Sequence, residues 1–159
     1  MILTGLYSFL TGGAESKEEI SIEKLKKIIA LEQERMKKLS EIGESTEFFF
    51  KEPKYKPALL EWKDMTPQEV SDSISDTSSI LCDIKPTDFT ADKLKEILMT
   101  EAGKCLSNDG KTDRGRLLWP LRAALSGREK SPGPFEIAEI LDKEKTLKRI
   151  EQAKKLLKK

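Results

Sequence analysis

The sequence contains no histidine, and only two of its 159 residues are cysteines. Without histidine, a serine or cysteine triad of the usual kind cannot form, and the commonest general base of enzymes is missing. Cys82 and Cys105 do not stand in a C-x-x-C arrangement, so neither a zinc site nor a disulfide framework is expected. We therefore predict no metal site and a location in the reducing cytoplasm.

The glycines are too scattered to form a phosphate-binding loop. Neither G-x-x-x-x-G-K-[ST] nor G-x-G-x-x-G occurs in the chain. The acidic residues stand mainly where exposed helical faces are expected, which is typical of a solvated surface and not of a catalytic pair. We predict no catalytic residue and no bound cofactor in this chain.

Residues 1–13 are apolar, but the stretch is too short to span a bilayer. It also lacks the basic residues that precede the apolar part of a signal peptide. We interpret it as a short docking segment or a truncated end, and we expect no membrane association.

Charge is distributed unevenly along the chain, although the formal net charge is only +1. Residues 101–159 carry 15 Lys and Arg against 9 Asp and Glu, whereas residues 1–100 carry 14 against 19. A basic C-terminal part could form a phosphate-contacting face. A lysine-rich helix end that complements the helix dipole would give the same balance.

Apolar residues recur at helical spacing through most of the chain, and no convincing period-two strand is present. We predict one long amphipathic helix from residue 21 to about 43, then an aromatic cluster at residues 48–50. Further helices are predicted at residues 67–81, 90–102, 114–126, 134–141 and 146–157. The expected fold is all-α, a bundle or cage of about six to seven helices in two packed subdomains. We place these at residues 20–60 and 61–159, with residues 1–19 unassigned.

Several helix ends carry clear local signals. Thr66, Pro67 and Glu69 form a capping box with proline in the first helical position. Thr90 is expected to cap the helix of residues 90–102, and Gly127 is expected to close the helix of residues 114–126. Pro120 lies inside that helix and removes a backbone donor, so we expect a kink or a restart there.

Basic residues alternate with aromatic, proline and small residues between positions 111 and 135. Such a mixture suits single-stranded RNA, because arginine forks bind base edges or phosphates and flat apolar surfaces receive unstacked bases. In the alternative interpretation, Trp119 and Phe135 are core residues and the arginines form a solvated face. The pattern alone favours this alternative. The candidate phosphate contacts are Arg114, Arg116, Arg128 and Lys130.

Two motifs in this region resemble a known family. LLWPLRAALSG at residues 117–127 and SPGPFEI at 131–137 resemble the C-terminal signature of bacterial-type glutamate–tRNA ligases, which are class I aminoacyl-tRNA synthetases. ERMKKLSEI at 34–42, FFF at 48–50 and WKDMTP at 62–67 resemble earlier parts of the same anticodon-binding region. The resemblance covers about residues 20–157, in the order of the family.

The resemblance implies an α-helical cage that receives the splayed anticodon of tRNA(Glu). It assigns Arg122 to the first anticodon base and Arg35 to the third. With an arginine at position 35, the chain resembles those family members that are restricted to glutamate tRNA. The residues that match the loop lining the middle base are Ser131, Pro132, Pro134 and Phe135.

The family's catalytic domain, which would hold ATP and Mg²⁺, has no counterpart among these motifs. We therefore expect a monomeric chain that binds tRNA, and not DNA, without charging it. The alternative is a helical protein-interaction module derived from the same domain, motivated by the apolar residues 1–13. A third hypothesis, an intact enzyme, requires a catalytic domain from another chain or from sequence outside this one.

Overall fold

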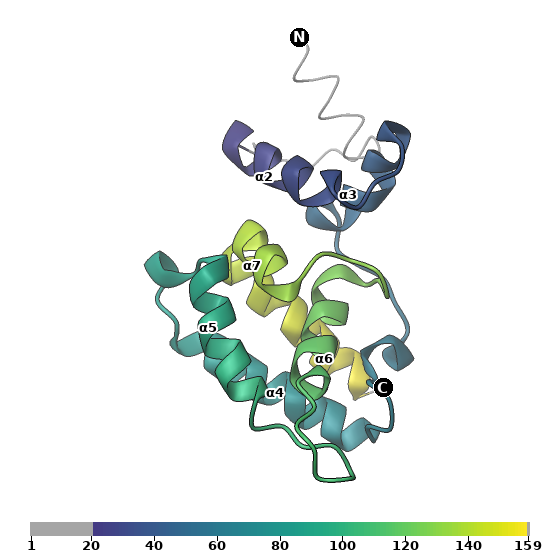
Figure 1. The fold of residues 1–159 in the computed structure, drawn as a ribbon, viewed down its shortest axis with the longest axis vertical. Coiled ribbons are helices and arrows are strands. Elements are labelled where there is room, and N and C mark those ends of the chain that lie inside the picture. The colour runs from purple at the N-terminus through teal and green to yellow at the C-terminus, as the bar shows by residue number, and fades with distance from the viewer. Residues whose placement is uncertain (1–20, 159) are drawn as a thin grey trace. The chain divides into compact units, whose positions relative to one another are not determined.

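The computed structural model describes residues 21–158, and its regular structure is helical (Figure 1). Within those residues there is no strand, only an isolated bridge between Leu106 and Thr112. The all-α prediction is confirmed. The chain divides into two compact units between Glu52 and Pro53. The apolar residues 1–13 lie outside the described part.

The N-terminal unit is a pair of helices joined by a turn. It contains α2 (Ile22–Gln33), the 3-10 turn η1 (Leu39–Glu41) and α3 (Ile42–Phe50). The Ser21 hydroxyl caps α2 by accepting a hydrogen bond of 3.2 Å from the backbone N–H of Lys24. The apolar sides of the two helices cover each other through the following cluster: Leu25, Ile42, Ile29, Met36 and Phe50.

The prediction of one long helix from residue 21 to 43 is wrong. α2 ends at Gln33, and the aromatic cluster at residues 48–50 belongs to a second helix, α3. The apolar stripe of α2 needs a covering surface, and the turn after Gln33 lets α3 fold back and supply it. Met36 lies in this turn, and not in a continuing helix, and it packs against the cluster of Leu25 and Ile42.

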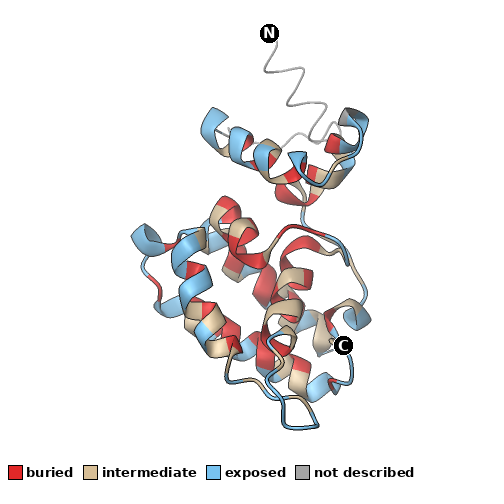
Figure 2. Ribbon diagram, viewed as in Figure 1, coloured by how far each residue is buried: buried red, intermediate tan, exposed pale blue. Residues whose placement is uncertain are grey.

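The C-terminal unit packs four α-helices around one core. Its elements are η2 (Pro57–Leu60), α4 (Pro67–Asp83), η3 (Pro86–Asp88), α5 (Ala91–Ala102), α6 (Gly115–Ser126) and α7 (Pro134–Leu157). α4, α6 and α7 all pack on one another, and α5 packs on α6 and α7. Figure 2 shows the buried residues gathered on their inward sides. The largest fully buried side chains of this unit are Leu60, Ile74, Leu81, Leu94, Leu98, Leu121, Leu125, Ile137, Leu141 and Ile150.

The predicted division after residue 60 differs from the observed one. η2 packs on α6 and α7, and Leu60 is completely buried. Residues 53–60 therefore belong to the C-terminal unit.

Three predicted helix ends agree with the structure. Thr66 and Glu69 form the complete capping box before α4, and the Thr90 hydroxyl caps α5. Gly127 ends α6 in the left-handed conformation with φ 65°. There the backbone N–H of Gly127 donates to the carbonyl of Ala123 over 2.7 Å.

α6 continues through Pro120 from Gly115 to Ser126, without the predicted restart. Proline cannot donate to the carbonyl four residues earlier, which here belongs to Arg116. The Ser73 hydroxyl of α4 donates to that carbonyl over 2.8 Å. A side chain from a neighbouring helix thus replaces the lost backbone donor.

α7 is kinked at Asp142, which has φ 67° and ψ 173°. The Asp142 carboxylate accepts a hydrogen bond of 3.1 Å from the backbone N–H of Lys145 and caps the second half of the helix. Two predicted helices are therefore present, but the second begins directly after its cap Asp142 and not at Thr146. Thr146 is buried, and its hydroxyl donates to the carbonyl of Ala138 over 3.3 Å.

Candidate functional site

One face of α6 carries a row of residues that line a hollow. Gly115, Leu118, Trp119 and Arg122 stand at spacings of three, four and seven residues, which places them on one side of the helix. Trp62 and Pro134 complete the lining of a cavity of about 250 Å³. The hollow combines two indole rings with one guanidinium group, so it can receive a flat ring and donate hydrogen bonds to it.

Arg122 lies over the ring of Trp119. Its guanidinium carbon is 4.6 Å from the centroid of the indole, and its Nη2 donates to the carbonyl of Glu129 over 3.0 Å. Trp119 is itself fixed, because its indole N–H donates to the carbonyl of Leu59 over 2.9 Å. A guanidinium held over an aromatic ring still presents a planar set of donors, which can meet the edge of a base.

Trp62 packs on the other tryptophan of the pair. The ring centroids of Trp62 and Trp119 lie 5.1 Å apart at an interplanar angle of 37°. The indole N–H of Trp62 donates to both carboxylate oxygens of Asp113, over 3.1 and 3.2 Å. Lys63 lies over the ring of Trp62 with Nζ 5.0 Å from the centroid. The result is a continuous series of contacts, here called the stack, from Lys63 through both tilted indoles to Arg122.

Asp113 connects this stack to the start of α6. Its carboxylate accepts a hydrogen bond of 2.9 Å from Lys63 Nζ and one of 3.1 Å from the backbone N–H of Gly115. The hydrogen bond from Lys63 lowers the pKa of Asp113 below its ordinary value, and the N–H of Trp62 adds to this effect. Asp113 is therefore held in its charged form.

The loop predicted to line the middle base is largely covered. Pro134 lines the hollow beside Arg122. Ser131, Pro132 and Phe135 are buried, and Phe135 belongs to the core of the unit. The structure thus brings Pro134 together with Arg122 and makes Phe135 a packing residue.

Arg35, the second predicted base-reading arginine, belongs to the N-terminal unit. It lies in the turn after α2, and not within a helix as predicted, with 42% of its side chain exposed. Its Nε lies 3.9 Å from the buried carboxylate of Glu32. The carboxylate orients a guanidinium that still reaches solvent.

The four predicted phosphate contacts are not equivalent. Arg114 and Lys130 are exposed, and Arg128 is half-buried. Arg116 is only 7% exposed. Its Nη1 donates to Glu69 over 2.9 Å and its Nη2 to Asp64 over 3.0 Å. Because these donors are already bonded to carboxylates, the geometry speaks against Arg116 as a phosphate contact and makes it a structural link.

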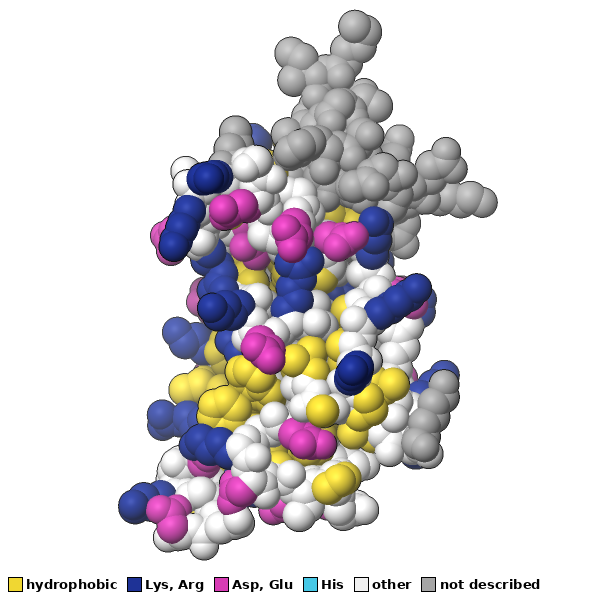
Figure 3. Space-filling model, turned by 90° about the vertical axis from the view of Figure 1, so that its right-hand side faces the viewer, with side chains coloured by type: hydrophobic (Ala, Val, Ile, Leu, Met, Phe, Trp, Pro, Cys, Tyr) yellow, Lys and Arg dark blue, Asp and Glu magenta, His cyan; other side chains and the backbone are white. Residues whose placement is uncertain are grey.

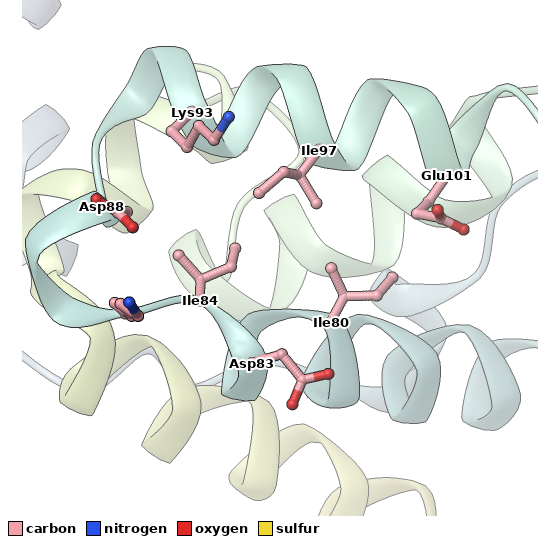
Figure 4. Close-up of a pocket in the computed structure, with 8 residues that line it drawn as sticks. Ile80, Asp83, Ile84, Asp88, Lys93, Ile97 and Glu101 are labelled. Carbon is pink, nitrogen blue, oxygen red and sulfur yellow. The ribbon is translucent and has the colours of Figure 1, made fainter.

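A second hollow lies between the end of α4 and α5, with a volume of about 420 Å³. Figure 4 shows Ile80 and Ile84 pointing across it toward Ile97. Its charged lining residues are Asp83, Lys85, Asp88, Lys93 and Glu101. None of the predicted site residues lines this hollow.

On the face of the C-terminal unit drawn in Figure 3, hydrophobic side chains gather in one patch with basic and acidic side chains around it. Within residues 21–158, no three Cys, Asp or Glu side chains come close enough together to hold a metal ion. In the same part of the chain, no helix has the length and apolarity needed to cross a membrane.

Comparison with known proteins identifies the family. Residues 4–154 match the family described as an anticodon binding domain. The chain belongs to this family of anticodon-binding domains.

Similar proteins are much longer than the matching part. Glutamate–tRNA ligase 1 of Caldanaerobacter subterraneus is 34% identical over 88% of this chain, but over only 28% of its own length. The ligase of Clostridium acetobutylicum is 33% identical over 87% of the chain and 27% of its length. A crystal structure of a glutamate tRNA ligase from Elizabethkingia meningosepticum superposes with a TM-score of 0.75 at 27% identity, covering 98% of this chain and 29% of that one. The anticodon-binding domain thus spans less than a third of the relatives it matches.

Three residues that line the hollow of this anticodon-binding domain were not predicted as site residues: Trp62, Gly115 and Leu118. Helical spacing could have predicted two of them, because Gly115 and Leu118 lie on the same face of the helix as Trp119 and Arg122. Trp62 lies on a connector before α4, and its contact with Trp119 depends on how α6 packs. No local pattern reveals that contact.

Proposed function

We propose that this anticodon-binding domain binds the anticodon of tRNA(Glu), with Arg122 reading the first base and Arg35 the third. The observation that carries the proposal is the Arg122 guanidinium, whose carbon lies over the Trp119 ring at 4.6 Å from its centroid, at the edge of an apolar hollow. An unstacked base entering this hollow would meet both an aromatic surface and a planar set of donors.

Arginine suits this role because it only donates hydrogen bonds. Both pyrimidines carry an O2 acceptor, and the anticodons for glutamate begin with a pyrimidine. A purine at this position is larger and presents a different edge. A good contact between arginine and a base edge discriminates by roughly 1 to 3 kcal/mol in comparable recognition.

Exposed basic residues would supply affinity without sequence selection. Arg114 and Lys130 are exposed in the C-terminal unit and are free of the carboxylate contacts that occupy Arg116. Phosphate contacts of this kind position an RNA and make its binding dependent on salt.

In the parent ligase, we propose, ATP, Mg²⁺ and glutamate are bound by the remaining part of the protein, and this domain links anticodon capture to aminoacylation there. On this proposal the chain works in the cytoplasm as a monomer, prefers tRNA to DNA, and binds tRNA without charging it.

The test is a titration of the full chain with three transcripts at low and moderate salt. They are tRNA(Glu), the same tRNA with a purine as first anticodon base, and the same tRNA with guanine as third base, which is a glutamine anticodon. We expect the unaltered transcript to bind most tightly at both salt concentrations. Equal Kd values for all three transcripts at every salt concentration would refute anticodon reading.

Arg122→Lys provides a matched variant, because it keeps the positive charge and removes the planar fork. We expect it to lose discrimination at the first base and to keep discrimination at the third. Arg35→Lys should show the reverse. If both variants retain full discrimination, the two arginines do not have these roles.

A further inference from the structure

Trp62 stands at the centre of a chain of contacts that ends at Arg122. One face of its ring packs on Trp119, and Lys63 lies over the ring at 5.0 Å. Trp119 then carries the guanidinium of Arg122 at 4.6 Å. The orientation of the arginine therefore depends on two rings, of which only one belongs to the same helix.

The position of Trp62 is fixed from several sides. Asp113 accepts its indole N–H through both carboxylate oxygens. The carbonyl of Trp62 accepts from the backbone N–H of Met65 over 3.0 Å, which closes a turn over residues 62–65. Within that turn Lys63 has a left-handed backbone with φ 48°, an unfavourable conformation for a residue with a side chain. A strained residue persists only where its surroundings determine it, and here its ammonium is held by Asp113.

Gly115 provides the space that the ring occupies. A Cβ atom at this position would lie 2.2 Å from Cε2, 2.4 Å from Nε1 and 2.6 Å from Cζ2 of Trp62. Real side chains do not approach so closely, so the ring rests directly on the backbone at the start of α6. Its backbone φ is not left-handed, so close packing and not conformational freedom requires the glycine.

We propose that Trp62 is a positioning residue, which holds Trp119 and through it the Arg122 guanidinium in the orientation that reads the first anticodon base. This inference rests on the proposed function of Arg122. It adds Trp62 and Gly115 as residues that determine selectivity at one anticodon position without having to donate a hydrogen bond to the base themselves.

Trp62→Leu and Trp62→Phe test the inference in the full chain. Leucine removes the flat ring, whereas phenylalanine keeps a smaller flat ring against Trp119 and loses one ring of the indole together with the N–H bonded to Asp113. We expect Trp62→Leu to lose most of the first-base discrimination, which has a starting ratio of roughly 5- to 150-fold when one good base contact sets it. Trp62→Phe should retain most of it.

Third-base discrimination is the internal control, because Arg35 belongs to the other compact unit. Trp62→Leu should leave it unchanged, at a temperature where circular dichroism shows the variant folded. Unchanged first-base discrimination in Trp62→Leu would overturn the inference. Equal loss at both bases would also overturn it, because that pattern indicates general damage. Wild-type chain that discriminates at neither base would instead refute the proposed function.

Gly115→Ala is a second, independent test of the inference, because this substitution removes no hydrogen-bonding group. The new methyl group should displace Trp62 and reproduce the selective loss at the first base. Gly103→Ala is the matched control, because its Cβ would meet nothing closer than the Thr100 carbonyl oxygen at 3.3 Å. A Gly115→Ala variant with the discrimination of Gly103→Ala would contradict the role of the ring.

Fluorescence reports on the stack directly, because Trp62 and Trp119 are the two tryptophans of the chain. In Trp62→Phe and Trp62→Leu, all emission excited at 295 nm comes from Trp119. We expect tRNA(Glu) to change that emission in Trp62→Phe as it does in the wild type, and to change it less in Trp62→Leu. The same change in both variants would show that Trp119 does not depend on Trp62 for its position, and would overturn the inference.

Discussion

The Ser73 hydroxyl donates a hydrogen bond of 2.8 Å to the backbone carbonyl of Arg116. That carbonyl is the acceptor which Pro120 leaves without its helical donor. α4 therefore maintains the continuity of α6, the helix that carries Trp119 and Arg122.

Ser73→Ala should destabilise the C-terminal unit by about 1 to 3 kcal/mol, because it leaves the Arg116 carbonyl without a donor in a buried place. Urea unfolding followed by circular dichroism measures this change. Ser75→Ala, on the exposed side of the same helix, should have little effect. In the double variant Ser73→Ala/Pro120→Ala, the restored backbone N–H should recover part of the loss. Strictly additive effects would contradict the link between the two residues.

Gly127→Ala and Gly110→Ala separate backbone strain from packing. Both glycines have a left-handed backbone, with φ 65° and 78°. A Cβ on Gly110 would meet nothing within 4 Å, whereas one on Gly127 would lie 2.6 Å from Cβ of Pro53. Gly110→Ala should cost about 1 to 2 kcal/mol of stability from conformation alone. Gly127→Ala should cost on the order of 1 to 3 kcal/mol more, because the methyl group also overpacks. Equal losses in urea unfolding would show that Pro53 moves away freely.

Local chemistry predicts the helix ends of the C-terminal unit well. The Thr66 and Glu69 capping box and the Gly127 end involve residues within four positions of each other, so the sequence alone contains their partners. The end of α2 at Gln33 has no such signal, because neither proline nor glycine follows until Gly43. That helix stops where α3 can fold back and cover its apolar side, which is a property of the tertiary structure.

The candidate site likewise combines features that the local sequence predicts with contacts that only tertiary packing creates. Arg122 was predicted by resemblance within a contiguous motif, and its position beside Trp119 follows from helical spacing. The contact of Trp62 with Trp119 joins residues far apart in the chain and requires the packing of η2, α4 and α6. The contacts of Arg116 could not be predicted from the sequence for a similar reason, because its carboxylate partners Asp64 and Glu69 precede it by about fifty positions.

Tyr55 gives a prediction at alkaline pH. Burial raises the pKa of Tyr55 from 10.0 to about 12, although the charge of Arg149 acts in the opposite direction. The folded state thus keeps a proton that the unfolded chain releases. The corresponding stability is complete below pH 10 and is lost as the pH rises toward 12. Stability should therefore fall between pH 10 and 12 more steeply in the wild type than in Tyr55→Phe, as measured by urea unfolding. Parallel curves would contradict the raised pKa.

Arg114 and Arg116 are two residues apart but should respond to substitution in opposite ways. Arg114 is exposed at the start of α6, whereas Arg116 is buried between Asp64 and Glu69. If Arg114 contacts a phosphate, Arg114→Gln should reduce the slope of log Kd for tRNA against log salt concentration by about 0.7, the value for one contact with a single strand. It should leave the free energy of unfolding nearly unchanged.

Arg116→Gln should instead lower the free energy of unfolding by on the order of 1 to 3 kcal/mol, because a buried group loses its charged hydrogen bonds. Its salt slope should equal that of the wild type when both are measured well below the unfolding temperature. Glu69 is informative here, because the backbone N–H and hydroxyl of Thr66 lower its pKa before Arg116 contributes. The Glu69 carboxylate therefore stays charged without Arg116. The loss of stability should come from the missing hydrogen bonds of Arg116 and not from a change in the charge of Glu69. A reduced salt slope in Arg116→Gln, with stability intact, would restore Arg116 as a phosphate contact and contradict its structural role.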